Sequence, residues 1–184
     1  VLVGCGAMTM EELSGNVGPV FVSFSFGLSV TVSIILFRSY SGAHFNPAVS
    51  FVMAITQQIT FKEMWIYFLA QFSGATVAAF ILRLIFYRSE FLGATIPHTS
   101  DAFVMELGAS LFLMLVISFS ANTSFAPFLI GFAVFLDAYY VGPFTGASMN
   151  PARTLGPAIV SGNFQGLWIY FFAPVVGMWG ASEI

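Results

Sequence analysis

The sequence predicts an all-α membrane protein, and three observations support this prediction. Hydrophobic residues make up 58% of the 184-residue chain and charged residues only 7%, whereas soluble domains are about 45–50% apolar and about 25% charged. The long apolar stretches are continuous, without the alternation of a transmembrane β-barrel. Two shorter apolar stretches both begin with Asn-Pro-Ala. We therefore expect a single transmembrane domain over residues 1–184, surrounded mainly by lipid.

Six stretches are candidates for membrane-spanning helices, which need about 20 mainly apolar residues. They are residues 1–10, 18–37, 65–87, 102–120, 126–141 and 167–184. Polar links are expected between them, at 9–17, 38–44, 88–101 and 121–125. The first stretch has about half the required length and the chain begins at Val1 inside it, without the basic start of a signal peptide. We therefore expect a fragment or a truncated product, with its first and last spans shortened.

Two further stretches, 46–56 and 150–160, are apolar but too short to cross a bilayer, a length typical of re-entrant segments. Each begins with Asn-Pro-Ala, and asparagine is a good N-cap while proline fits the first helical turn. The frame SGAHFNPAV from Ser41 aligns with TGASMNPAR from Thr145, with five of nine positions identical. Three expected spans separate the copies, so the second enters from the opposite face. We expect an inverted repeat of about 1–87 and 101–184, with its half-helices meeting near the bilayer midplane.

Two half-helices that meet at their N-termini bring two partial positive charges together. Irregular backbone at this depth is tolerated only where it is packed or lines an aqueous cavity. We expect its carbonyl groups to accept hydrogen bonds from a solute, the amides of Asn46 and Asn150 to donate them, and cations to be repelled. The pore-lining backbone positions would be Gly42, Ala43, His44, Phe45, Gly146, Ala147, Ser148 and Met149.

Arg153 directly follows the second Asn-Pro-Ala copy. A buried arginine in a membrane is costly unless it is paired or lines water. We expect Arg153 to be a cationic donor in the pore wall. The alternative is an interfacial arginine whose side chain extends to the lipid headgroups.

The two frames, together with FGLSV at 26–30, resemble the major intrinsic protein family, the aquaporins and aquaglyceroporins. The resemblance covers nearly the whole chain. It implies an aquaporin-like right-handed bundle of six transmembrane helices plus two re-entrant half-helices, assembled as a homotetramer in lipid, with the plasma membrane as its expected location. It implies passive passage of water, of glycerol and, as a further candidate, of urea, with protons and ions excluded. The narrow centre of the pore would be formed by Asn46, Pro47, Ala48, Asn150, Pro151 and Ala152.

The resemblance also implies a second filter, on the extracellular side, formed by Phe26, Ala138, Ala147 and Arg153. Strict water channels carry histidine where this chain has Ala138. Alanine would widen the filter and make one wall apolar, which suits the carbon backbone of glycerol, although such walls discriminate by only about 1–3 kcal/mol per methylene. The pattern is similar to insect glycerol-permeable aquaporins (entomoglyceroporins). A one-residue shift would instead place Asp137 or Tyr139 in the filter.

Other polar residues have two interpretations each. Within the family, Glu106 would brace the second re-entrant loop by accepting backbone N–H bonds, rather than contact the solute, and Gln71 would act in the same way elsewhere. His44 would either modulate permeability with pH or bond a backbone group. The single cysteine, Cys5, is expected to be a small buried hydrophobe, and no Cys/His spacing suggests a metal or another cofactor.

Three other functions remain open at this point. The first is a strict water channel. The second is an adhesive membrane protein that keeps the fold but conducts little, and the third is a truncated, non-conducting isoform. The five Lys and Arg residues form no cluster, which argues against nucleic acid as a partner. We find no nucleophile with a base and no paired carboxylates, so an enzyme is not expected.

Overall fold

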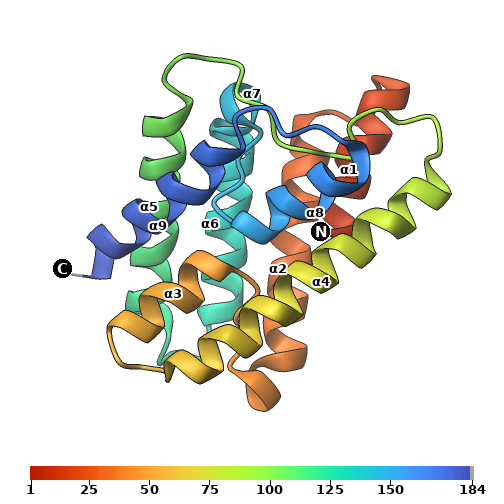
Figure 1. Cartoon of the computed structure of the whole chain (residues 1–184). Coiled ribbons are helices and arrows are strands. Elements are labelled where there is room, and N and C mark those ends of the chain that lie inside the picture. The colour runs from red at the N-terminus through yellow and green to blue at the C-terminus, as the bar shows by residue number, and fades with distance from the viewer. Residues whose placement is uncertain (183–184) are drawn as a thin grey trace.

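The computed structural model describes residues 1–182, and the regular structure in these residues is entirely helical. The last two residues of the expected span 167–184 lie outside the described residues. Figure 1 shows α5 with α9 on one side of the bundle, α4 with α1 and α8 on the other, and α2 beside α6 between them. The helices are α1 (Leu2–Ser14), α2 (Pro19–Ser41), α3 (Pro47–Ile55), α4 (Phe61–Ile85), α5 (Ala102–Ser120), α6 (Ala126–Tyr140), α7 (Gly142–Thr145), α8 (Pro151–Ser161) and α9 (Leu167–Ser182).

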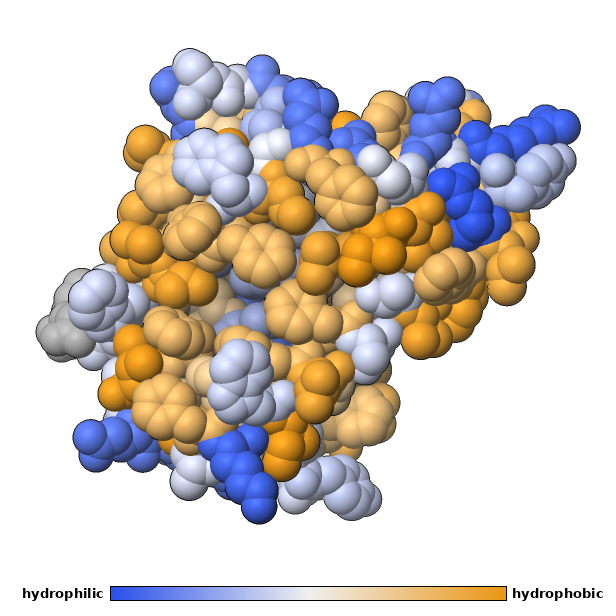
Figure 2. Space-filling model, viewed as in Figure 1, coloured by the Kyte–Doolittle hydropathy of each residue, from blue (hydrophilic) through white to orange (hydrophobic). Residues whose placement is uncertain are grey.

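The surface of the bundle has the character of a membrane protein. The helices α2, α4 and α5 are long and apolar enough to cross a bilayer, and α6 and α9 are shorter apolar helices. Large apolar side chains are exposed along them, among them Leu69, Leu84 and Phe119, at 73%, 82% and 77%. Figure 2 shows an apolar band across the molecule with hydrophilic residues at both ends. Such a continuous exposed band is the surface that lipid requires.

The two short apolar stretches form the half-helices α3 and α8, and the local sequence explains where each begins. Asn46 and Asn150 have extended backbones, with φ of −141° and −151°, and act as N-caps. Their side-chain oxygens accept from the N–H groups of Ala48 and Ala152, at 3.0 Å in both cases. Proline occupies the first helical position in both half-helices, where its missing N–H has no partner to lose.

The expected boundaries of several helices were wrong. Most of the expected polar link 9–17 belongs to α1, because the Glu11 carboxylate accepts from the N–H groups of Val17 and Gly18 and so connects α1 directly to α2. Arg38 belongs to α2 rather than to a link. The start of α4 is four residues earlier than the expected 65, because Thr60 and Glu63 form a capping box. The short α7 was not expected at all.

Close packing between helices joins the two halves of the chain. α2 packs along α6, α4 along α8 and α9 along α3. At the α2–α6 contact a Cβ on Gly131 would overlap the Thr31 hydroxyl, which donates to the carbonyls of Gly27 and Pro127 at 3.1 Å each. Small residues allow this close approach of membrane helices. The main buried cluster contains the start of α3 and the loop before α8, which are therefore held inside the bundle.

Candidate transmembrane pore

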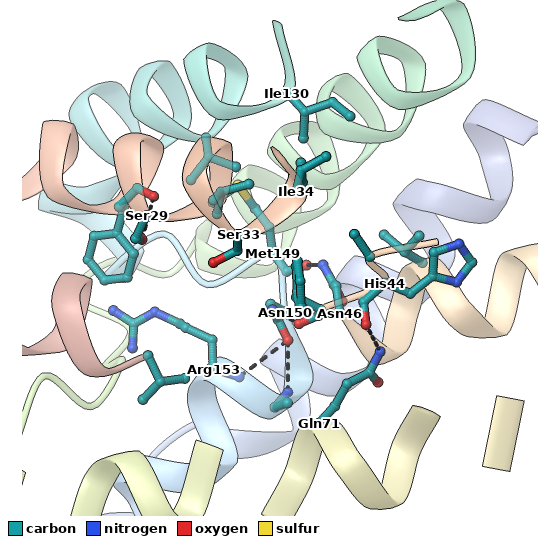
Figure 3. A pocket seen from close by; sticks show the side chains of 18 of the residues that line it. Ser29, Ser33, Ile34, His44, Asn46, Gln71, Ile130, Met149, Asn150 and Arg153 are labelled. Atoms are coloured by element: carbon teal, nitrogen blue, oxygen red, sulfur yellow. Dashed lines mark hydrogen bonds between the residues drawn. The ribbon is translucent and has the colours of Figure 1, made fainter. Parts of the chain in front are cut away.

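A cavity of about 530 Å³ lies within the bundle and is lined by residues of α1, α2, α4, α5 and α6 and of both re-entrant segments. Both asparagines of the repeated motif line it (Figure 3). The lining by the spanning helices is mainly apolar, and polar groups come chiefly from the two loops before α3 and α8. Such a cavity, apolar with a few convergent polar groups, is typical of a small-molecule site.

The two asparagines are bonded crosswise. The Asn46 amide nitrogen donates to the carbonyl of Met149 at 2.7 Å, and that of Asn150 donates to the carbonyl of Phe45 at 3.0 Å. Each side chain therefore caps its own half-helix through its oxygen and fixes the opposite loop through its nitrogen. Because an amide carries two N–H donors, one donor on each asparagine remains for a solute. Pro47, Ala48, Pro151 and Ala152 are buried behind them at the helix starts.

The expected carbonyl acceptors fall into two groups. Those of Phe45 and Met149 are engaged by the asparagines, and that of His44 accepts from Gln71 at 2.7 Å. The carbonyls of four other residues that line the cavity accept no hydrogen bond from any residue the structure describes: Gly42, Ala43, Ala147 and Ser148. Gly146 does not line the cavity within this description. These four carbonyls are the acceptors that a solute can use.

Backbone conformation helps to direct these carbonyls. Ala43, Ala147 and Met149 have φ values of 57°, 44° and 51°, a left-handed conformation that is unfavourable for residues other than glycine. Such residues persist only where their surroundings determine them, and they concentrate at functional sites.

Glu106 lies behind the second loop rather than in the cavity wall. It is fully buried and accepts from the Thr145 hydroxyl at 2.6 Å and from the N–H groups of Ser148 and Met149 at 2.8 Å each. Tyr170 holds the same segment by donating to the Thr145 carbonyl at 2.6 Å. The carboxylate of Glu106 thus fixes the backbone whose carbonyls line the pore.

Gln71 holds the first loop from α4. Its amide nitrogen donates to the His44 carbonyl and to the Ser50 hydroxyl, the latter at 2.9 Å. The His44 ring stacks on Tyr67 at 4.8 Å between centroids, and its buried Nδ1 has no hydrogen-bond partner among residues 1–182. Its Nδ1 therefore does not bond a backbone group, contrary to one of the two interpretations drawn from the sequence.

The four residues of the expected filter, Phe26, Ala138, Ala147 and Arg153, all line the cavity. The Arg153 guanidinium lies 4.9 Å from the centroid of the Phe26 ring and donates to the Gly93 carbonyl at 2.7 Å. Arg153 is only 4% exposed, so it does not extend to the surface as an interfacial arginine would. Neither Asp137 nor Tyr139 is among the described residues that line the cavity. The alignment of α6 that places Ala138 in the cavity wall is therefore the one the structure has.

Several residues of the site were missed from the sequence. The Met8 sulfur lies 2.8 Å from an Arg153 nitrogen, and Gly93 supplies that side chain's carbonyl partner. No local pattern connects these distant positions with Arg153. Ser29 and Ser33 also line the cavity, and their spacing of three and seven residues from Phe26 could have placed them on one helical face with it.

Two further expectations concern residues outside the pore wall. Cys5 is fully buried, as a small hydrophobe would be. Within residues 1–182 the structure contains no group of three His, Cys, Asp or Glu residues that could hold a metal ion.

Comparison with known proteins gives consistent results. The family model described as "Major intrinsic protein" matches residues 1–183. Aquaporin NIP3-1 of Arabidopsis thaliana is 40% identical over 195 residues, which cover 96% of this chain and 60% of that protein. Nodulin-26 of Glycine max is 38% identical, with coverages of 96% and 69%. The chain thus spans about 60% of the length of the first of these relatives.

Among solved structures, the aquaglyceroporin from Plasmodium falciparum superposes with a TM-score of 0.89 at 24% identity, covering 99% of this chain and 88% of that one. This likeness concerns the fold, and it confirms the predicted fold class. The two relatives named above are plant proteins, and the resemblance to insect glycerol channels is not shown by these comparisons.

Proposed function

The chain belongs to the major intrinsic protein family, and on that premise we propose that it forms a passive channel for water and small neutral solutes, glycerol and urea among them. Members of this family are passive channels, so no chemical reaction is assigned to the chain. We place it as a multi-pass integral protein of the plasma membrane, with lipid against its apolar band. The relatives named aquaporins support the water function, and the solute range rests on this chain's own filter residues.

The observation that carries the proposal is the pair of asparagines in the cavity. Asn46 and Asn150 each keep one free N–H donor there, and the unengaged carbonyls of the two loops stand beside them as acceptors. A water molecule or a hydroxyl group that enters the apolar cavity can exchange its hydration shell for these groups. Permeation requires binding that is favourable enough for entry and weak enough for release, and neutral hydrogen bonds meet both needs.

The same geometry explains why ions would be excluded. The N-termini of α3 and α8 face the cavity and carry partial positive charge. Arg153 adds a full positive charge in the filter. No acidic side chain is among the described residues that line the cavity. For a cation or a hydronium ion, this repulsion opposes whatever attraction the few free carbonyls provide, and no charged acceptor among the described residues compensates for it.

We propose that the two halves of the chain, about 1–87 and 101–184, form an inverted repeat. The packing supports this, because α4 packs on α8 of the other half and α9 packs on α3 in return, while α2 and α6 join the halves. We also propose a homotetramer, with the exposed apolar faces of the spanning helices divided between neighbouring subunits and lipid. Chemical cross-linking in native membranes, followed by electrophoresis in denaturing detergent, is expected to give a four-subunit product.

Stopped-flow light scattering on proteoliposomes tests the function directly. We expect rapid shrinkage in a sucrose gradient, and rapid shrinkage followed by fast re-swelling in a glycerol gradient. Fast shrinkage without glycerol re-swelling would mean a strict water channel. No acceleration over empty vesicles, with the fold verified by circular dichroism, would favour the non-conducting alternatives.

A further inference from the structure

The pore face of α2 carries two parallel rows of side chains. Residues four apart in sequence lie above one another on a helix. One row, Phe26, Val30 and Ile34, is apolar, and the row beside it is formed by the hydroxyls of Ser29 and Ser33. The spacing of these serines therefore gives the wall formed by α2 a polar edge along the pore.

The other spanning helices offer a solute little polarity. Their described residues that line the cavity are apolar or small, apart from Gln71, and on α2 Arg38 also lines it. Both amide hydrogens of Gln71 are engaged, by the His44 carbonyl and by Ser50. The Arg38 guanidinium donates to the carbonyls of Ala121 and Thr123, at 2.6 and 3.1 Å. The Gln71 side-chain oxygen has no hydrogen-bond partner among residues 1–182, but it is a buried atom. The two serines are thus the spanning-helix side chains best able to bond a solute.

The hydroxyls of both serines can form further hydrogen bonds. Ser29 donates to the Phe26 carbonyl at 2.8 Å, which leaves its oxygen as an acceptor. Ser33 is half-buried, and its hydroxyl forms no hydrogen bond with any residue among 1–182, so the donor and the acceptor of this hydroxyl are both available. Figure 3 shows the Ser33 hydroxyl pointing away from α2 into the space that Asn150 and Arg153 face from the other side. A hydroxyl in apolar surroundings is costly without a partner, and a permeating solute would supply one.

We propose that Ser29 and Ser33 are specificity-determining residues that form a second hydrogen-bonding wall opposite the asparagines. Such a pore favours compact solutes with hydrogen-bonding groups on two opposite sides. Urea meets this description, because one of its amino groups can donate to the loop carbonyls while the other donates to a serine oxygen. Acetamide has nearly the same size, but a methyl group replaces one amino group. This inference rests on the proposed channel function and specifies its solute class.

The matched pair of solutes makes the inference testable. Urea and acetamide fluxes are measured on proteoliposomes containing the wild-type chain, Ser33→Ala and the double variant Ser29→Ala/Ser33→Ala, with empty vesicles subtracted. The net worth of one hydrogen bond corresponds to a change of roughly three- to tenfold. We expect urea flux to fall by about this factor, while the acetamide and water fluxes change less than about twofold. Ser33→Thr, which keeps the hydroxyl, should retain the wild-type urea-to-acetamide ratio.

The control is Ser39→Ala, the same change on an exposed part of α2 that does not line the cavity, and it should leave both fluxes unchanged. If the serines acted only by size, removing a hydroxyl would widen the pore and raise both fluxes, which would overturn the inference. An unchanged urea flux, or an equal loss of urea and acetamide, would also overturn it. A wild-type chain that conducts water but not urea refutes the inference and leaves a water channel. A folded chain that conducts nothing refutes the proposed function, and the inference with it.

Discussion

The two re-entrant loops share a nine-residue frame but are held in different ways. The first loop, residues 42–45, is exposed or half-exposed, and its main support is the neutral amide of Gln71. The second loop, residues 146–149, is mostly buried and is held by the fully buried carboxylate of Glu106. Hydrogen bonds to a charged group are worth about 1.5–3 kcal/mol, against about 0.5–1.5 kcal/mol for neutral pairs.

The difference corresponds to what each loop supplies. Both loops contribute free carbonyls and an asparagine to the cavity, but only the second leads into the proposed filter, through Ala147 and Arg153. A filter has to keep its donors in place as each solute passes. The stronger hydrogen bonds, those to the Glu106 carboxylate, accordingly support the loop that leads into the proposed filter. The shared frame therefore determines how each half-helix begins, and the spanning helices around it determine how firmly each loop is held.

The largest expected effect comes from removing the brace of the second loop. Glu106→Ala leaves the buried N–H groups of Ser148 and Met149 and the Thr145 hydroxyl without their acceptor. Each such buried group costs about 1–3 kcal/mol, so for the three groups together we expect a loss of roughly 3–9 kcal/mol in the free energy of unfolding and loss of all solute flux. Thermal unfolding in detergent and stopped-flow scattering measure the two quantities. Glu90→Ala, the same substitution at an exposed position, is the control and should leave stability and flux unchanged. A Glu106 variant as stable as the wild type would contradict this role of the carboxylate.

The next largest effect concerns the charge that Arg153, in the first turn of α8, places in the cavity. Arg153→Val removes the only full positive charge proposed for the filter, and we expect proton flux to rise about tenfold or more, which corresponds to roughly 1.4 kcal/mol of lost barrier. A pH-sensitive dye inside proteoliposomes reports this flux. Lys62→Val, at an exposed position, should show no leak. A proton flux through the Arg153 variant equal to that of the wild type would contradict this role. Proton exclusion would then depend on the N-termini of α3 and α8 alone.

Much of this architecture was predictable from the sequence, because the strongest signals are local or repeated. The continuous apolar stretches predict the membrane spans, and the two Asn-Pro-Ala copies predict both half-helices. A capping asparagine followed by proline determines where a helix starts through contacts within four residues. The two asparagines follow from the repeated motif, whereas the expected filter residues and the loop-bracing role of Glu106 follow from the resemblance to the family.

What could not be predicted depends on contacts between residues far apart in the sequence. The crosswise donation between the asparagine amides and the opposite loops joins residues more than 100 positions apart. It decides which carbonyls remain free, and the frames alone made all of them look equivalent. The contact of Met8 with Arg153 spans 145 positions. The boundaries of α1 and α4 were missed for a smaller reason, because acidic side chains there bond backbone N–H groups instead of marking a polar link.

A smaller effect is expected from a substitution in the proposed filter, at Ala138. Ala138→His introduces the residue that the family resemblance assigns to strict water channels. It would narrow the cavity and add a donor to the wall that Phe26 and Arg153 also line. We expect glycerol flux to fall about tenfold, the scale on which a pocket rejects an extra methylene, while water flux falls less than about twofold. Stopped-flow scattering with sucrose and glycerol gradients gives both rates. Equal loss of both permeabilities in folded protein would show that Ala138 does not set solute size.

The smallest expected effect is on the first loop, and it tests the comparison between the loops most directly. Gln71→Ala removes the two donors that hold the His44 carbonyl and the Ser50 hydroxyl, at a cost of about 1–2 kcal/mol. Because this loop is already partly exposed, water can replace the lost donors. We therefore expect faster amide exchange at residues 42–45, unchanged exchange at 146–149 and a fall in the free energy of unfolding well below that of Glu106→Ala. Hydrogen–deuterium exchange with mass spectrometry resolves the two loops, and equal loosening of both would mean that the crosswise asparagine bonds couple them into one unit.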